Sequence, residues 1–251
     1  MSTESPSAPL GVLGPMSVGS FIDDRAIRAS KQRLLLALLL VEADRDVPRD
    51  LLVDELWLGN PPSSWPTTLQ TYVYQLRKHT LPGSPGRIRT TRSGYRLEID
   101  RSLLDWCEFE RRAGEADRSA FARPVVADAY REALALWRGT ALADVDHSPR
   151  VQAVAERLER LRRAARAAQL TASYRSGRLV DVIADARSVL MDDPLNETAH
   201  VCLIRSLAGR GRRHDAARHL HRFRKRLLSE AGVASATVVE TAYAEAAREP
   251  V

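Results

Sequence analysis

The 251-residue sequence predicts a mainly α protein with a small β component, in which a winged helix-turn-helix precedes an all-α domain of tetratricopeptide-like helices. Two patterns indicate this. Between residues 30 and 99, three helix-like segments precede a hairpin-like one. After residue 103 the apolar spacing is helical almost throughout, and a Gly-Arg pair at Gly177 recurs 34 residues later at Gly211. With 44% hydrophobic residues, a chain of this length can form two separate cores.

The first domain is expected to span residues 10–102. Before it, the Ser- and Pro-rich residues 1–9 are expected to be disordered, and the following Gly-punctuated stretch predicts short strands up to about Asp24. Apolar residues at helical spacing then predict three helices, over residues 31–45, 49–57 and 66–80. The third helix is expected to bury Leu69, Val73 and Leu76.

Capping and turn residues set the expected limits of these elements. Ser30 can cap the first helix, and Pro66 suits the start of the third, where its missing N–H costs nothing. Residues 87–92 and 95–99 alternate as two short strands, with Ser93-Gly94 as the tight reversal between them.

The charge pattern predicts a nucleic-acid interface on the third helix and the hairpin. Between Glu55 and Glu98 the sequence contains no acidic residue, so the local field is expected to come from Lys and Arg alone. An arginine-bearing hairpin is often only a solvated edge strand, but a solvated face normally mixes both signs of charge. The basic residues of this stretch are Arg77, Lys78, Arg87, Arg89, Arg92 and Arg96.

Other functional classes lack their usual signatures. The net charge of +6 and pI near 9.7 are compatible with a polyanion, and no phosphate-binding loop, nucleophile elbow or zinc-protease motif is present, so neither an enzyme nor a cofactor is expected. The cysteines Cys107 and Cys202 are isolated, and the histidines His214, His219 and His221 have poor metal-ligand spacing, so no metal is expected. With neither a signal peptide nor a membrane span of ~20 residues, a cytoplasmic, nucleoid-associated protein without membrane contact is expected.

The second domain, expected over residues 103–251, is predicted to be a short stack of antiparallel helix pairs. Gly177 and Gly211 fit left-handed helix ends, and such a stack offers a concave surface for a partner. A second basic run, from Arg205 to Arg226, is expected to be solvated or paired with acids between Glu240 and Glu249, because its arginines spread around a helix. The alternative is that this run contacts DNA or an acidic protein surface.

Several blocks together resemble the Streptomyces antibiotic regulatory protein family of transcriptional activators. They are RASKQRLLLALLL, RDLLVDELW, PPSSWPTTLQTYVYQLRK, TTRSGYRLEID and ALALWRGTALADV, in an order that covers the chain from about Leu10 to Gly232. The resemblance implies a winged helix of the response-regulator type followed by a bacterial transcriptional activation domain. It also implies a pathway-specific activator of a secondary-metabolite (antibiotic) cluster that binds promoter direct repeats and recruits RNA polymerase through its sigma factor. Direct repeats imply protomers that associate head to tail on DNA.

Carried onto this sequence, the family's recognition helix falls on residues 67–78 and its wing on residues 89–95. Arg77 is expected to read base edges, and Arg92 to be the main wing contact with the backbone. Trp65-Pro66 and Gln75 depart from the family pattern, as does the tail after Leu227. The expected DNA-binding residues are Thr67, Thr68, Thr71, Tyr72, Tyr74, Gln75, Arg77, Lys78, Arg87, Arg89, Thr90, Arg92 and Tyr95.

Two other functions fit the same residues. In one, the helical domain is a protein-binding adaptor and the winged helix is an interaction module only. In the other, the chain is a repressor that uses the same DNA site. DNA affinity that falls steeply with ionic strength would separate DNA binding from the adaptor.

Overall fold

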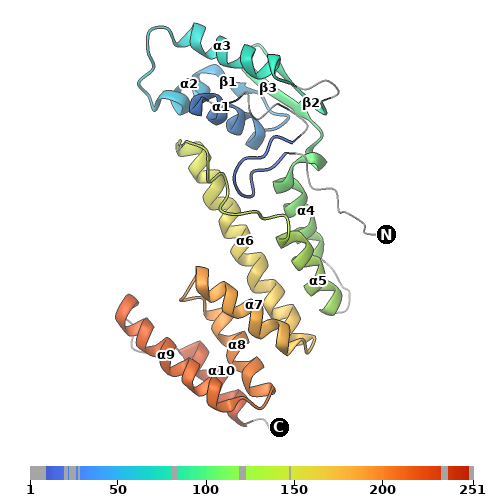
Figure 1. The fold of residues 1–251 in the computed structure, drawn as a ribbon, viewed down its shortest axis with the longest axis vertical. Coiled ribbons are helices and arrows are strands. Elements are labelled where there is room, and N and C mark those ends of the chain that lie inside the picture. The colour runs from blue at the N-terminus through green and yellow to red at the C-terminus, as the bar shows by residue number, and fades with distance from the viewer. Residues whose placement is uncertain are drawn as a thin grey trace. The chain divides into compact units, whose positions relative to one another are not determined.

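The computed structural model describes residues 10–19, 22, 27, 29–80, 84–118, 123–146, 148–232 and 237–248 (Figure 1). The chain forms two compact units, one of Met1–Arg112 with Ala133–Arg162 and the other of Ala113–Glu132 with Arg163–Val251. Helices dominate and one small sheet lies in the first unit, which confirms the predicted fold class. The disorder expected for residues 1–9 lies outside the described residues.

Three helices form the core of the first unit: α1 (Ser30–Val41), α2 (Arg49–Trp57) and α3 (Trp65–Lys78). Every residue from Leu34 to Leu40 is buried, because α2, α3 and the sheet pack around α1. The first helix was predicted to reach residue 45, but it ends at Val41, and Asp44 adopts a left-handed φ of 64°. Ser30 is the first helical residue rather than the cap.

The sheet consists of β1 (Val47–Pro48), β2 (Gly86–Thr90) and β3 (Gly94–Ile99), antiparallel in the order β1-β3-β2. β1 was not predicted, since Pro48 had been interpreted as a turn residue. The strands expected between residues 10 and 24 do not form in the described part of that stretch, which makes only isolated bridges, such as Gly11 with Ser17.

Gly94 lies in β3 and is not part of the reversal that was predicted for it. A Cβ at this position would lie 1.9 Å from the carbonyl oxygen of Val47, so only glycine lets β1 approach β3 here. The chain reverses at residues 91–93 instead: the Thr91 N–H donates to the Gly94 oxygen at 2.9 Å, and the Gly94 N–H donates to Thr91 Oγ1 at 3.2 Å.

Residues beyond position 102 complete the first unit. Asp105, the first residue of α4 (Asp105–Arg118), is buried and accepts the N–H groups of Val12 and Leu13 at 2.9 and 3.1 Å, together with a guanidinium N–H of Arg138 at 3.0 Å. Burial raises the pKa of this carboxyl, against the lowering effect of these hydrogen bonds. The boundary predicted between residues 102 and 103 stays a prediction, but the compact unit crosses it.

The start of α6 (Pro149–Arg175) makes a second connection within this unit. The Arg150 guanidinium donates twice to Glu42, which follows α1, at 2.6 and 3.0 Å. The Arg150 backbone N–H donates to Glu55 of α2 at 3.0 Å. Arg150 thus ties the first two helices of the winged helix to a helix that begins about 100 residues later in the sequence.

The second unit is helical, and its core lies among α7 (Leu179–Asp192), α8 (Glu197–Gly209), α9 (Arg213–Ala231) and α10 (Thr237–Arg248). α5 (Arg123–Leu134) precedes them in the sequence. Gly177 and Gly211 have φ angles of 77° and 74°, which confirms the left-handed ends predicted for the repeat. The residue after each glycine closes the helix end: the Arg178 N–H donates to the Ser173 oxygen, and the Arg212 N–H donates to the Leu207 oxygen.

Candidate nucleic-acid interface

One face of α3 carries the side chains expected to meet DNA. Leu69, Val73 and Leu76 are buried as predicted, and helical spacing therefore turns the opposite face to solvent. Tyr74 presents a large aromatic side chain on that face, 60% exposed. The exposed residues of this stripe after Pro66 are Thr67, Gln70, Thr71, Tyr74, Arg77 and Lys78.

Gln70 belongs to this stripe although it was not among the predicted residues. It follows Thr67 by three positions and precedes Tyr74 by four, which is the spacing of one helix face. That signal was available in the sequence. A glutamine amide can pair with the two major-groove positions of adenine, so Gln70 has the chemistry of direct base reading.

Thr68 and Thr71 use their hydroxyl hydrogens inside the helix. Thr68 Oγ1 donates to the Ser64 oxygen at 3.0 Å, and Thr71 Oγ1 donates to the Thr67 oxygen at 2.9 Å. The two hydroxyl oxygens can still accept hydrogen bonds, and the methyl groups can contact a thymine methyl. Thr71 is exposed and Thr68 half-buried, so Thr71 is the more accessible of the two.

Arg77 joins α3 to the wing. Its Nε donates to the carbonyl oxygen of Ile88 at 3.0 Å, and its Nη2 donates to Thr90 Oγ1 at 2.8 Å. These contacts use two of the five guanidinium N–H donors and give Arg77 a positioning role between helix and hairpin. Base reading by Arg77 stays a prediction.

Tyr95, one of the predicted DNA-binding residues, is buried, with 4% of its surface exposed. The guanidinium groups of Arg49 and Arg77 lie 5.8 and 5.9 Å from its ring centroid. Tyr72 is half-buried and stacks on Trp57, with 6.5 Å between the ring centroids. Both tyrosines hold α3 in place from behind the exposed stripe.

The wing carries less net positive charge than the acid-free stretch indicated, because Glu98 of β3 and Asp46 from before β1 pair with its arginines. Glu98 accepts from Arg87 at 2.7 Å and from Arg89 at 2.9 Å, and Asp46 accepts from Arg96 at 2.7 Å. The hydrogen bond from Arg87 holds the pKa of Glu98 below its usual range. A field set by Lys and Arg alone was therefore wrong: Glu98 ends the acid-free stretch and lies against its arginines.

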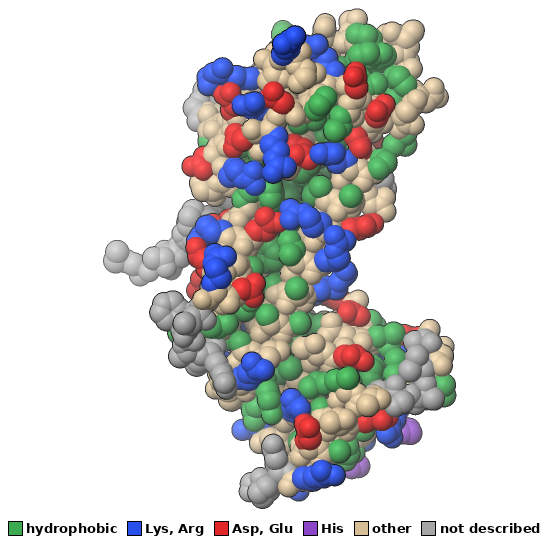
Figure 2. Space-filling model, turned by 180° about the vertical axis from the view of Figure 1, so that it is seen from behind, with side chains coloured by type: hydrophobic (Ala, Val, Ile, Leu, Met, Phe, Trp, Pro, Cys, Tyr) green, Lys and Arg blue, Asp and Glu red, His purple; other side chains and the backbone are tan. Residues whose placement is uncertain are grey.

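Arg92 and Lys78 have no ion-pair partner among the described residues, and both are exposed. Arg92 lies at the reversal between β2 and β3, and Lys78 is the last residue of α3. On the face drawn in Figure 2, Lys and Arg side chains lie beside Asp and Glu side chains. Against that background of paired charges, these two cations remain available for phosphate groups.

The remaining predicted residues divide by accessibility. Thr67, Arg87, Arg89 and Thr90 are exposed, although both arginines hold Glu98 and Thr90 accepts from Arg77. Gln75 is half-buried on the flank of α3. The structure thus brings the stripe and the hairpin tip to the surface, and places Tyr95 in the interior.

No cluster of three His, Cys, Asp or Glu side chains that could hold a metal occurs in the described part of the chain. None of the helices described is long and apolar enough to cross a bilayer. Burial raises the pKa of both thiols, Cys107 and Cys202.

Comparison with known proteins assigns both parts of the chain. Residues 25–97 match the family described as "Transcriptional regulatory protein, C terminal", and residues 104–245 match "Bacterial transcriptional activator domain". The regulatory protein DnrI of Streptomyces peucetius is 34% identical over 216 residues, which cover 82% of this chain and 79% of DnrI. The transcriptional regulator RedD of Streptomyces coelicolor is 32% identical over 249 residues, 96% of this chain and 71% of RedD.

A solved structure of Mycobacterium tuberculosis EmbR in complex with a low-affinity phosphopeptide has a similar fold, with a TM-score of 0.83 at 25% identity. The match covers 98% of this chain but only 66% of that one. Both segments of the chain and their order agree with the resemblance noted in the sequence. The chain therefore belongs to the Streptomyces antibiotic regulatory protein family of DNA-binding transcriptional activators.

Proposed function

We propose that the chain binds promoter DNA with α3 in the major groove and the β2–β3 hairpin against the neighbouring backbone. The observation that carries the proposal is the exposed stripe of α3, which Arg77 joins to the hairpin whose tip carries Arg92, an exposed cation without an ion-pair partner among the described residues. The groove of B-DNA admits one α-helix, and the polar residues of the stripe, among them Gln70 and Thr71, are types that pair with base edges.

The proposed contacts fall into two groups. Gln70, Thr71 and Tyr74 read bases, because they project from the middle of the exposed face of α3. Lys78 and Arg92 bind phosphates, because both are exposed and without an ion-pair partner among the described residues. Arg87 and Arg89 together hold one carboxylate, so this trio keeps a single net positive charge and contributes less.

We further propose that binding occurs at direct repeats, that protomers associate head to tail on DNA, and that the bound protein recruits RNA polymerase with contacts to its sigma factor. The regulated genes would form a secondary-metabolite cluster, and the protein would be located on the nucleoid in the cytoplasm. Membership of the family supports this, together with the likeness to two regulators from Streptomyces species. Direct repeats place successive protomers in the same orientation, which requires a heterologous contact between them.

Genome-wide mapping of the protein on DNA in its own cells, joined to transcript levels with and without it, tests the proposal. Discrete sites at tandem repeats, with transcripts lost on deletion, are the expected result. Transcripts that rise on deletion would make the protein a repressor. The absence of discrete sites would favour the protein-binding adaptor.

A matched pair of variants connects that experiment to α3. The double change Gln70→Ala with Tyr74→Ala removes two exposed side chains of the stripe and should abolish the discrete sites. Val180→Ala, on α7, truncates a side chain that is 61% exposed and should leave the sites unchanged. Equal site maps for both variants would remove α3 from the DNA interface.

A further inference from the structure

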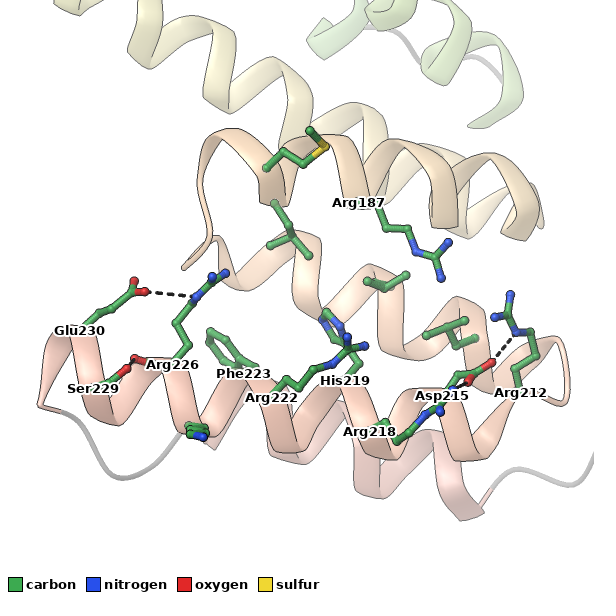
Figure 3. Close-up of a pocket in the computed structure, with 15 residues that line it drawn as sticks. Arg187, Arg212, Asp215, Arg218, His219, Arg222, Phe223, Arg226, Ser229 and Glu230 are labelled. Carbon is green, nitrogen blue, oxygen red and sulfur yellow. Dashed lines mark hydrogen bonds and ion pairs between the residues drawn. The ribbon is translucent and has the colours of Figure 1, made fainter.

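The second unit contains a cleft of about 640 Å³ between α7, α8 and α9 (Figure 3). Its rim is basic, and its lining also contains Leu203, Leu207 and Phe223, which belong to the helical core. Met191, at the end of α7, lines the cleft and is 83% exposed. A basic rim beside apolar surface is unusual for a solvated helix face, which normally mixes signs of charge.

Part of the rim is neutralised within the protein. Arg212 and Arg218 both pair with Asp215, and Arg226 pairs with Glu230 at 3.2 Å. These pairs occupy the two ends of the cleft, where Asp215 and Glu230 lie. The predicted pairing of this basic run with the C-terminal acids is confirmed for Arg205 and Arg224, which bind Glu245 and Glu240 of α10. The arginines at the ends of the cleft pair with acids of α9 instead.

Three cations of the lining remain. Arg187 on α7 and Arg222 and Lys225 on α9 are exposed and have no ion-pair partner among the described residues. Figure 3 shows Arg187 directed into the space between α7 and α9, and Arg222 reaching toward His219. The middle of the cleft therefore holds positive charge that the described residues do not balance, flanked by neutralised ends.

The imidazole pair of His219, which lines the cleft, and the neighbouring His200 is neutral. His200 Nε2 lies 3.0 Å from the Pro194 carbonyl oxygen, which can only accept, so this nitrogen carries the proton. Neutral His200 then accepts at Nδ1 from His219 Nε2–H at 2.7 Å. Burial and the nearby positive charges lower the pKa of His219 to about 4, which keeps it neutral near pH 7.

The length of the cleft favours a polypeptide over a small molecule. Its lining extends along α9 from Arg212 to Glu230, which is about 27 Å at about 1.5 Å per residue. An extended chain of about eight residues covers that distance at ~3.3 Å per residue. DNA fits less well, because the exposed apolar side chain of Met191 would have no apolar counterpart on a phosphate backbone.

We propose that this cleft binds an extended, acidic protein segment in which carboxylates alternate with apolar side chains. The carboxylates would pair with Arg187, Arg222 and Lys225, and an apolar side chain would cover Met191. The bidentate fork of arginine suits a carboxylate. This site lies entirely within the second unit and does not depend on the proposed DNA contacts.

Fluorescence anisotropy on the full chain tests the proposal, with a fluorescein-labelled decapeptide in which Asp and Glu alternate with Leu. Saturable binding that weakens with salt is expected. The double variant Arg187→Glu with Arg222→Glu should weaken it at least tenfold. The matched control is Arg210→Glu, because Arg210 is exposed at the end of α8, has no ion-pair partner among the described residues and does not line the cleft.

Met191→Ala provides a second test that keeps every charge. The side chain is almost fully exposed, so its removal should leave the fold intact and weaken the peptide severalfold. Three results would overturn the proposal: no saturable binding to the unaltered chain, equal binding by the double variant and the Arg210→Glu control, or equal affinity for a decapeptide with Ser in place of Leu. Circular dichroism of each variant confirms that it is folded.

Discussion

The guanidinium of Arg77 on α3 donates to the hydroxyl of Thr90 on β2 at 2.8 Å, and the same group donates to the carbonyl oxygen of Ile88 at 3.0 Å. Two donors of one rigid fork thus fix the end of the helix against the hairpin. Because Tyr95 lies under this guanidinium, its aromatic ring adds a cation–π contact to the connection. Helix and hairpin should therefore approach DNA as one piece.

Arg77→Ala should lower the free energy of unfolding by about 1 to 2 kcal/mol, because two charge-assisted hydrogen bonds at a partly exposed site are lost. It should weaken DNA binding by similar factors on cognate and scrambled sites. Lys78→Ala is the control, since it removes a neighbouring charge that has no ion-pair partner among the described residues and should leave stability unchanged. Urea unfolding and binding titrations measure both effects. A loss of affinity restricted to the cognate site would show that Arg77 reads a base.

Arg92→Ala should reduce the slope of log affinity against log salt by about 1, as expected for one lost phosphate contact. Stability should change by less than about 0.5 kcal/mol, because Arg92 is exposed and unpaired among the described residues. Arg96→Ala offers a comparison on the same hairpin, where the charge is already held by Asp46. An unchanged slope for Arg92→Ala would exclude this residue from the backbone contact.

Gln70→Ala should weaken binding to the cognate site by about 1 to 3 kcal/mol and leave scrambled sites nearly unaffected, since a bidentate base contact is lost. Gln75→Ala is the matched control: the same side chain on the same helix, but half-buried on its flank. Titrations of both variants on both sites separate the roles. Similar losses on cognate and scrambled DNA would show that Gln70 does not read a base.

Gly94→Ala should destabilise the first unit by roughly 2 to 4 kcal/mol, because the new methyl group would overlap the carbonyl oxygen of Val47 and force β1 away from β3. Gly139→Ala is the control, since its Cβ would meet Pro15 at an ordinary 3.4 Å. The urea midpoint of each variant measures the cost. Equal midpoints would mean that β1 moves freely and does not limit residue 94.

The His200–His219 pair should make stability depend on pH. The pKa of His219 in the folded chain is about 4, below its usual 6.5, so between these values the unfolded chain binds more protons. The stabilising contribution of neutral His219 is complete above about pH 6.5. It declines as the pH falls toward 4, by roughly 1 to 2 kcal/mol after allowance for solvent screening. Burial lowers the pKa of His200 in the same direction.

His219→Asn should flatten this dependence, and urea unfolding at about pH 7 and pH 5 measures it. His221→Asn is the comparison, because His221 is exposed on the same helix and does not take part in the hydrogen bond between His200 and His219. If both variants keep the slope of the unaltered chain, the titration arises elsewhere in the protein.

Local patterns in the sequence predicted the parts of the fold that depend on neighbours along the chain. The bounds of α2 and the buried face of α3 follow from helical spacing, and Gly177 and Gly211 from the backbone that a helix end requires. The strand β1 escaped prediction because two residues that pair with a distant strand have no periodicity to detect.

In the candidate site, too, local features follow from the sequence, whereas contacts between distant segments do not. The exposed stripe of α3, Gln70 included, follows from helical spacing alone. The pairing of Glu98 with Arg87 and Arg89 depends on strand register, and the link from Arg77 to Thr90 depends on the packing of helix against hairpin. Neither leaves a trace in composition, so the sequence overstated the charge of the wing.

The contacts of Asp105 and Arg150 limit how freely the winged helix can be exchanged between members of the family. A chimera that exchanged the winged helix between relatives at residue 102 would separate the Val12 and Leu13 amides from the carboxylate that they share. It would also leave Glu42 and Glu55 facing a foreign helix start in place of Arg150. If α3 and the hairpin tip bind DNA as proposed, DNA specificity is therefore best exchanged between such regulators within these two segments, where the altered side chains face outward.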